Sequence, residues 1–119
     1  MEKILVVNND MDTMTLIKDL LEKKSYKVKY TSNGEESLHI AKKFVPDLVL
    51  VDVLQKDVIP DLKRHPETSQ IPILLMTGYT WSNDIINNVE ADDLIEKPFL
   101  MEHLQQKIQQ NINKRLNNY

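Results

Sequence analysis

The sequence predicts an α/β fold in which five parallel strands form one sheet with helices on both faces. Short apolar runs alternate with amphipathic stretches along the chain, and this alternation is typical of βα units. The runs at residues 48–51 and 73–76 are apolar at every position, as expected for parallel strands covered on both faces. The chain has 119 residues, enough for a single domain over 1–119 with its own core.

The first strand is predicted at residues 4–7, and the first helix begins near Asp10 or Asp12, since either can cap it. The helix should end near residues 23–24, where lysines suit a carboxyl terminus. Its inner face should carry Met14, Ile17 and Leu21, with Leu16 and Leu20 beside them. Residues 27–30 alternate charged and apolar side chains, which predicts an edge strand with one face in water.

The second helix should begin at residues 35–36 and end before Pro46, which cannot continue a helix. Its inner positions are predicted to be Leu38, Ala41 and Val45. The third strand follows at 48–51. After Asp52 the only helical candidate is short and runs from Pro60 to about residue 65.

The fourth strand is predicted at residues 73–76, and Ser82 or Asn83 could cap a helix after it. That helix would carry Ile85, Ile86 and Val89. The fifth strand includes residues 94–95. In the last helix apolar residues recur at every fourth position, which predicts a buried stripe of Leu104, Ile108, Ile112 and Leu116.

Composition limits the classes of function. The chain has 15 Lys and Arg against 18 Asp and Glu, so its charge gives no reason for direct contact with nucleic acid. Cysteine is absent, which excludes disulfides, thiolate metal sites and Cys nucleophiles. No stretch approaches the ~20 apolar residues of a membrane span, and we expect a cytoplasmic protein without a membrane partner. The three histidines show no metal-ligand spacing.

Three polar side chains follow apolar runs and form the candidate site. Asp52, Thr77 and Lys97 end the third, fourth and fifth predicted strands. The carboxyl ends of parallel strands meet at one edge of the sheet, where open α/β folds hold ligands. An acid, a hydroxyl and an ammonium group at such an edge can receive a phosphoryl group.

Several separated motifs resemble the receiver domain of two-component response regulators. They are KILVV at 3–7, SNGEE at 32–36, PDLVLVD at 46–52, IPI at 71–73, MTGY at 76–79 and KPF at 97–99. The resemblance covers nearly the whole chain and implies a doubly wound, flavodoxin-like sheet of strand order 2-1-3-4-5. It implies that Asp52 accepts a phosphoryl group from a sensor histidine kinase or a phosphotransfer protein, assisted by Thr77 and Lys97. The bond between Lys97 and Pro98 is often cis in this family.

The resemblance also implies a Mg²⁺ site, and here the sequence departs from the family. The metal would be held by an acidic pair after the first strand, by Asp52 and by the backbone carbonyl of Leu54. Asn8 and Asn9 occupy the places of the acidic pair, so we expect weak Mg²⁺ binding with Asn9 as a poor ligand. Asp10 is an alternative ligand, although capping the first helix is its other predicted task.

Signalling positions depart as well. Leu94 stands where the family usually has an aromatic side chain that responds to the Thr. Tyr79 and Trp81 follow the fourth strand and either pack at the edge of the core or contact a partner. The resemblance implies that a downstream protein, or a second copy of the chain in a homodimer, binds the face between the fourth and fifth helices.

Two functions remain open. One is a phosphate-accepting receiver that switches partner binding. The other is a pseudo-receiver, in which the same fold is an interaction module that needs no phosphorylation. An enzyme fits less well, because only Gly34 and Gly78 are present and neither a P-loop nor a dinucleotide fingerprint can be built.

Overall fold

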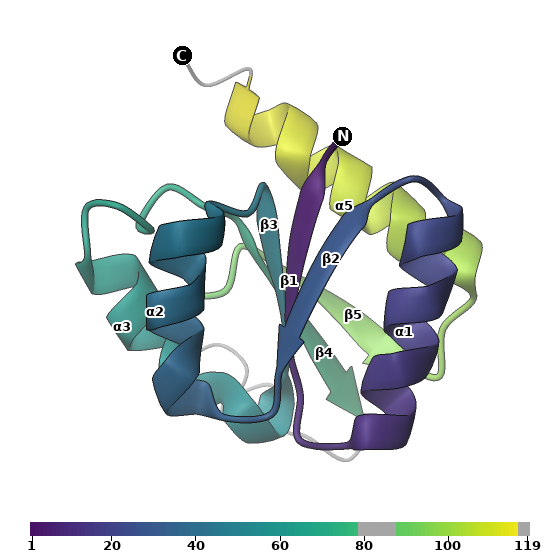
Figure 1. Ribbon diagram of the computed structural model, residues 1–119, viewed down its shortest axis with the longest axis horizontal. Coiled ribbons are helices and arrows are strands. Elements are labelled where there is room, and N and C mark those ends of the chain that lie inside the picture. Colours follow the sequence, from purple (N-terminus) through teal and green to yellow (C-terminus); the bar gives the residue numbers. More distant parts are fainter. Residues whose placement is uncertain (79–87, 117–119) are drawn as a thin grey trace.

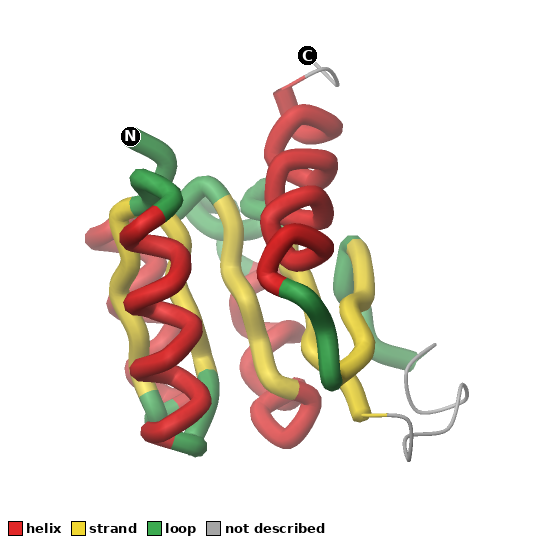
Figure 2. The backbone as a smooth tube through the Cα atoms, turned by 90° about the vertical axis from the view of Figure 1, so that its right-hand side faces the viewer, coloured by secondary structure: helices red, strands yellow, loops and turns green. Residues whose placement is uncertain are grey.

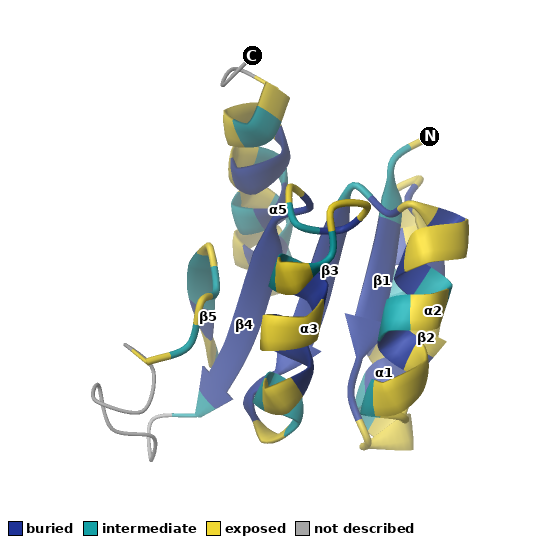
Figure 3. Cartoon of the chain, turned by 90° about the vertical axis from the view of Figure 1, so that its left-hand side faces the viewer, coloured by how far each residue is buried: buried dark blue, intermediate teal, exposed yellow. Residues whose placement is uncertain are grey.

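The protein is a five-stranded parallel sheet with helices on both faces, in a computed structural model that describes residues 1–78 and 88–116. The strands lie in the order β2-β1-β3-β4-β5 (Figure 1), which confirms the predicted fold. Their bounds are β1 Lys3–Val7, β2 Lys27–Thr31, β3 Leu48–Asp52, β4 Ile73–Gly78 and β5 Asp93–Lys97. β3 and β4 are buried along almost their whole length, whereas β5 is mostly half-buried (Figure 3).

Alternate residues of the strands feed two apolar clusters, one on each face of the sheet. Ile4 and Val6 of β1 pack in the cluster that contains the inner residues of helices α1 (Met11–Lys23) and α5 (Met101–Leu116). Leu5 and Val7 pack in the cluster of α2 (Gly34–Phe44) and α3 (Ile59–Arg64). This two-sided burial explains why the central strands are apolar at every position.

Helix α1 follows the prediction closely. Asp10 is its N-cap and accepts from the backbone N–H groups of Asp12 and Thr13, and Met14, Ile17 and Leu21 are buried. Leu16, however, is 59% exposed, because it lies outside the stripe that faces the sheet.

Helix α2 ends at Phe44, one residue before Val45, the last of its predicted inner positions. Ser37, Ala41 and Phe44 are buried, and they fall on one face at spacings of four and three. The prediction for Val45 was wrong: it is the C-cap, has a left-handed backbone with φ of 50° and is exposed. Leu38 is half-buried against the α2/α3 cluster.

A 3₁₀ helix, Val53–Val58, joins β3 to α3. Pro60 lies in the first turn of α3 as predicted, and the helix ends at Arg64. The helix expected after the fourth strand falls mostly on residues 79–87, outside the described residues. Val89 is described and packs, partly buried, against the α2/α3 cluster.

Helix α5 buries Leu104, Ile108 and Ile112 as predicted. The prediction for Leu116 was wrong, because this side chain is exposed. The carboxyl-terminal end of α5 projects beyond the sheet, so its last turn has no strand to cover (Figure 2). None of the helices in the described ranges has the length and apolar character needed to cross a lipid bilayer.

Candidate functional site

The structure brings Asp52 and Lys97 together at the carboxyl edge of the sheet. Asp52 is the last residue of β3 and Lys97 the last of β5. β4 lies between them, and its Gly78 is in register with Lys97. The Lys97 side chain reaches across β4, and its Nζ lies 2.6 Å from Oδ1 of Asp52.

Asp52 is a buried carboxylate with both oxygens engaged. The residue is 2% exposed, and its Oδ2 accepts from the backbone N–H of Leu54 at 3.0 Å. A buried charge is costly unless it is paired and hydrogen-bonded, and here Lys97 and Leu54 meet that need. The Lys97 side chain is 38% exposed, so the ammonium group bridges the carboxylate and the solvent. The bond between Lys97 and Pro98 is cis.

Thr77 lies in the adjacent strand and is also buried. It precedes Gly78 at the end of β4. Among the described residues no hydrogen bond joins Thr77 to Asp52 or Lys97, so the structure places the hydroxyl near this edge without linking it to the acid.

Asn8 and Asn9 have different environments, although the sequence presents them as a pair. Asn9 is exposed. Asn8 is 2% exposed, its backbone N–H continues the β1–β2 ladder to the carbonyl of Thr31, and its Oδ1 accepts from the N–H of Asp10 at 2.9 Å. The last bond is an Asx turn that shapes the loop between β1 and α1.

The amide nitrogen of Asn8 is a buried donor without an acceptor among the described residues. The β1–β3 register pairs Val7 with Val51, so the next residues along, Asn8 and Asp52, are neighbours on the same face of the sheet. Sequence reasoning identified the loss of acidic charge here, but it could not distinguish a buried Asn8 from an exposed Asn9.

Asp10 is committed to the start of α1. Its Oδ2 accepts from the Thr13 hydroxyl at 2.7 Å and its Oδ1 from two backbone N–H groups. The Thr13 hydroxyl is the main cause of a lowered pKa of Asp10, and the charge of Lys97 lowers it further. Both oxygens therefore serve the helix cap, as the sequence predicted.

The residues present do not fit a tightly held Mg²⁺. The described residues contain no group of three or more His, Cys, Asp or Glu side chains that could hold a metal. Mg²⁺ prefers anionic oxygens in octahedral geometry. Asp52 contributes one carboxylate that already contacts Lys97, Asp10 caps a helix, and the Asn8 oxygen is bonded to the backbone.

The predicted signalling positions are only partly visible. Leu94 in β5 is in register with Leu75 and packs, partly buried, against the α2/α3 cluster. Tyr79 and Trp81 lie outside the described residues, as does most of the expected fourth helix.

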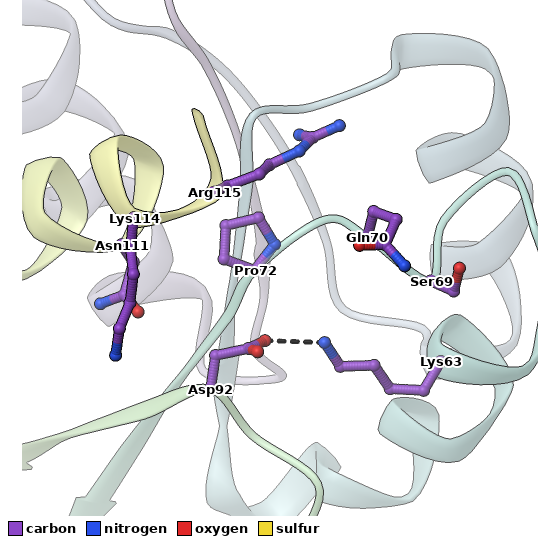
Figure 4. Close-up of a pocket in the computed structure, with 8 residues that line it drawn as sticks. All are labelled: Lys63, Ser69, Gln70, Pro72, Asp92, Asn111, Lys114 and Arg115. Carbon is purple, nitrogen blue, oxygen red and sulfur yellow. Dashed lines mark hydrogen bonds and ion pairs between the residues drawn. The ribbon is translucent and has the colours of Figure 1, made fainter. Parts of the chain in front are cut away.

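A polar pocket of about 290 Å³ lies at the opposite end of the sheet (Figure 4). Asp92 is one of its lining residues. Its Oδ2 accepts from Lys63 Nζ and from the N–H of Ile73, both at 2.7 Å. These bonds fix the segment that enters β5. Because this pocket adjoins the amino-terminal ends of the strands, it is separate from the site of Asp52 and Lys97.

The sheet order and the acid–lysine pair at its carboxyl edge define a receiver-type α/β domain. The family model of the response regulator receiver domain matches residues 4–109, and the chain belongs to this family. It is 35% identical over 103 residues to the transcriptional regulatory protein CpxR of Escherichia coli (strain K12), a match covering 83% of this chain and 44% of that protein. The chain spans half or less of the length of this relative and of the nisin biosynthesis regulatory protein NisR of Lactococcus lactis, which is 32% identical over 92% of the chain and 50% of its own length.

Solved structures agree on the fold. The signal receiver domain of a histidine kinase from Syntrophus aciditrophicus superposes with a TM-score of 0.85 at 26% identity, over 96% of this chain and 92% of that one. The receiver domain of sensor histidine kinase PA1611 from Pseudomonas aeruginosa has a TM-score of 0.86 at 21% identity, over 94% and 98% of the two chains. That structure holds a magnesium ion in its active-site cleft.

Proposed function

We propose that this chain accepts a phosphoryl group on Asp52 from a histidine kinase or a phosphotransfer protein. The observation that carries the proposal is the contact of 2.6 Å between Lys97 Nζ and the buried Asp52 carboxylate. A phosphoryl group carries negative charge on three oxygens, and a fixed ammonium beside the attacking carboxylate offsets that charge.

In the proposed reaction one Asp52 oxygen attacks the phosphorus of a phosphohistidine. The P–N bond breaks as the new P–O bond forms, and the imidazole leaves with the electron pair of the broken bond and gains a proton. Lys97 moves from the carboxylate to a phosphoryl oxygen, and the Thr77 hydroxyl donates to another. The Leu54 N–H keeps the carboxyl group oriented.

The test is direct. Incubation with Mg²⁺ and a small phosphodonor should add the mass of one phosphoryl group, and Asp52→Asn should abolish the adduct. Absence of an adduct, even with the cognate kinase, would defeat the proposal.

An apolar surface next to the site supports the idea of a protein donor. A cavity of about 510 Å³ lies between α1 and the start of α5, and it includes Lys97 itself. Its apolar lining comes from Leu16 and Leu20 of α1 and from Phe99 and Met101. A donor protein that fills this surface would bring its phosphohistidine to the adjacent Asp52.

Leu16→Arg tests this docking surface. Because Leu16 is largely exposed, the fold should persist, and transfer from the donor protein should fall while labelling by the small phosphodonor is unchanged. Leu116→Arg is a matched control, since Leu116 is equally exposed but lies at the far end of α5. Equal transfer to both variants would place the donor elsewhere.

The pseudo-receiver is the second candidate function, and the neutral Asn8 and Asn9 favour it. In this function the pair of Lys97 and Asp52 holds one conformation without metal or phosphate. The unphosphorylated wild type would then bind its partner, and Asp52→Ala, which removes the pair, would weaken that binding. Partner binding that required a phosphoryl group on Asp52 would end this alternative.

The remaining expectations belong to the same proposal. Mg²⁺ would bind weakly, a downstream partner or a second copy would use the face between the fourth and fifth helices, and no substrate would be turned over. Residues 1–119 would form one cytoplasmic domain. Absence of nucleic-acid contact is predicted for this chain alone, since relatives named as transcriptional regulators extend well beyond it.

A further inference from the structure

Among the described residues, no strand pairs with the outer edge of β2. β2 is an edge strand, and Figure 1 shows it between α1 and α2. The Lys27 N–H donates to the carbonyl of Glu2, and the Thr31 carbonyl accepts from the N–H of Asn8. Residues of a parallel strand bond alternately to either side, so Lys27, Lys29 and Thr31 face β1. The N–H and C=O groups of Val28 and Tyr30 therefore point outward.

A groove of about 340 Å³ lies over this edge. β2 contributes Val28, Lys29 and Tyr30, α1 contributes Lys18, and α2 contributes His39, Ile40 and Lys43. The groove thus combines a free strand edge with apolar and cationic side chains.

The positive charge of the groove is concentrated on its α2 side. Lys29 and Lys43 are exposed, and neither has a carboxylate within 4.0 Å among the described residues. Lys29 lies over the Phe44 ring of α2, with its Nζ 5.2 Å from the ring centroid. On the α1 side, Lys18 is neutralised by Glu22 at 3.0 Å. The chain as a whole has a net charge of −3, so this local excess of cations is a distinct feature.

The side chains of β2 also differ between its two faces, with a cation on the α2 side and apolar groups on the α1 side. Lys29 projects toward α2, whereas Val28 packs in the α1/α5 cluster, and Tyr30 shares the parity of Val28. A strand added to the edge would also direct alternate side chains to the two faces. Acidic side chains would meet Lys29 and Lys43, and the apolar side chains between them would lie along the Tyr30 side.

We propose that the β2 edge binds an extended partner segment of alternating acidic and apolar residues as an additional strand of the sheet. Backbone bonds to Val28 and Tyr30 would give affinity, and the two lysines would select the acidic side chains. A second copy of this chain is a poor occupant, because its Lys27 and Lys29 would face the same lysines. Edge lysines oppose pairing with a neutral or basic strand, and an acidic strand turns that repulsion into attraction.

The test uses a capped hexapeptide in which Glu and Val alternate. Its binding to the full chain should slow amide hydrogen exchange at Val28 and Tyr30 and leave the inward N–H groups of β2 unchanged. A peptide of the same composition with its three Glu and three Val in blocks should bind more weakly. The Lys–Val analogue should not bind.

Charge reversal provides the specificity control. Lys29→Glu with Lys43→Glu should raise the Kd of the alternating peptide about tenfold or more, the equivalent of two partly exposed ion pairs. The same variant should gain affinity for the Lys–Val peptide. Lys114→Glu with Arg115→Glu changes the net charge equally at a distant place on α5, and it should leave the Kd unchanged.

Three results would overturn the proposal. They are absence of binding by the alternating peptide, equal binding by the block peptide, and exchange protection of Val28 and Tyr30 that depends on protein concentration alone. Absence of peptide binding would mean that the edge lysines only prevent pairing with other strands. The last would make a second copy the occupant.

Discussion

The ion pair of Lys97 and Asp52 should contribute more to the free energy of unfolding than the ion pairs in which one partner is largely exposed. Lys97→Met keeps an unbranched side chain, one heavy atom shorter, and removes its charge. Asp52 would then be a buried carboxylate held only by the N–H of Leu54. Asp52→Asn in the same background removes the buried charge and should restore part of the lost stability.

The magnitude follows from burial. Removing one partner of a fully buried ion pair costs about 3–5 kcal/mol. Lys97 is 38% exposed, so solvent screening reduces this to about 2 kcal/mol for Lys97→Met. With a slope of about 2 kcal/mol per molar urea for a small protein, the unfolding midpoint should fall by about 1 M.

The assay is urea unfolding of the wild type, both single variants and the double variant. Lys18→Met is the matched control, because Lys18 pairs with Glu22 at 3.0 Å while both side chains are partly exposed. It should cost no more than about 0.5 kcal/mol. If Lys97→Met cost as little as Lys18→Met, or if Asp52→Asn restored no stability in the Lys97→Met background, burial of Asp52 would not make this ion pair stronger than a surface pair.

Three further predictions follow from other parts of the structure. Asn9→Asp should strengthen Mg²⁺ binding in calorimetry, because it adds an anionic oxygen near the site, and equal heats for both proteins would contradict this. Gly34→Ala should lower the free energy of unfolding by about 1–3 kcal/mol in the same urea assay, because the new Cβ would lie 2.6 Å from Cγ1 of Val58. Ser32→Ala, at an exposed position, is the control and should have little effect. Burial alone would raise the pKa of Asp93, but hydrogen bonds, led by that from Asn111, bring it below the ordinary value of 3.8. The ionised Asp93 therefore stabilises the fold above pH 3.8, and this contribution is lost as the pH falls through the lowered pKa. Asp93→Asn should therefore lose less free energy of unfolding than the wild type when the pH is lowered. Identical pH profiles of unfolding for the two proteins would contradict this role of Asp93.

The sheet could be predicted from the sequence because its signal is local and repeated. Every central strand is an uninterrupted apolar run, and the helices between them carry their apolar residues at helical spacing. The errors at Val45 and Leu116 arose where an element ends. Periodicity continues through such residues, but a left-handed cap and the edge of the sheet decide their burial.

The candidate site could be predicted as a set of residues but not as a set of contacts. Parallel strands bring their carboxyl ends together, and this placed Asp52 near Lys97. The hydrogen bond accepted by the buried Asn8 and the three bonds that commit Asp10 to a helix cap depend on loop geometry, and periodicity carries no information about it. The edge position of β2 was predicted by its alternating charged and apolar residues, whereas the full strand order came from the resemblance to a family.

The contact between Lys97 and Asp52 has opposite consequences in the two candidate functions, so one variant separates them. An acceptor must release Lys97 from the Asp52 oxygen when a phosphoryl group arrives, and the ammonium then stabilises the product. Lys97→Met should therefore abolish the response to a phosphodonor and leave partner binding by the unphosphorylated protein intact. In a pseudo-receiver the same contact maintains the binding conformation, and Lys97→Met should weaken partner binding in the absence of any phosphodonor. A variant that binds its partner normally and still responds to phosphodonor would show that Lys97 serves neither function.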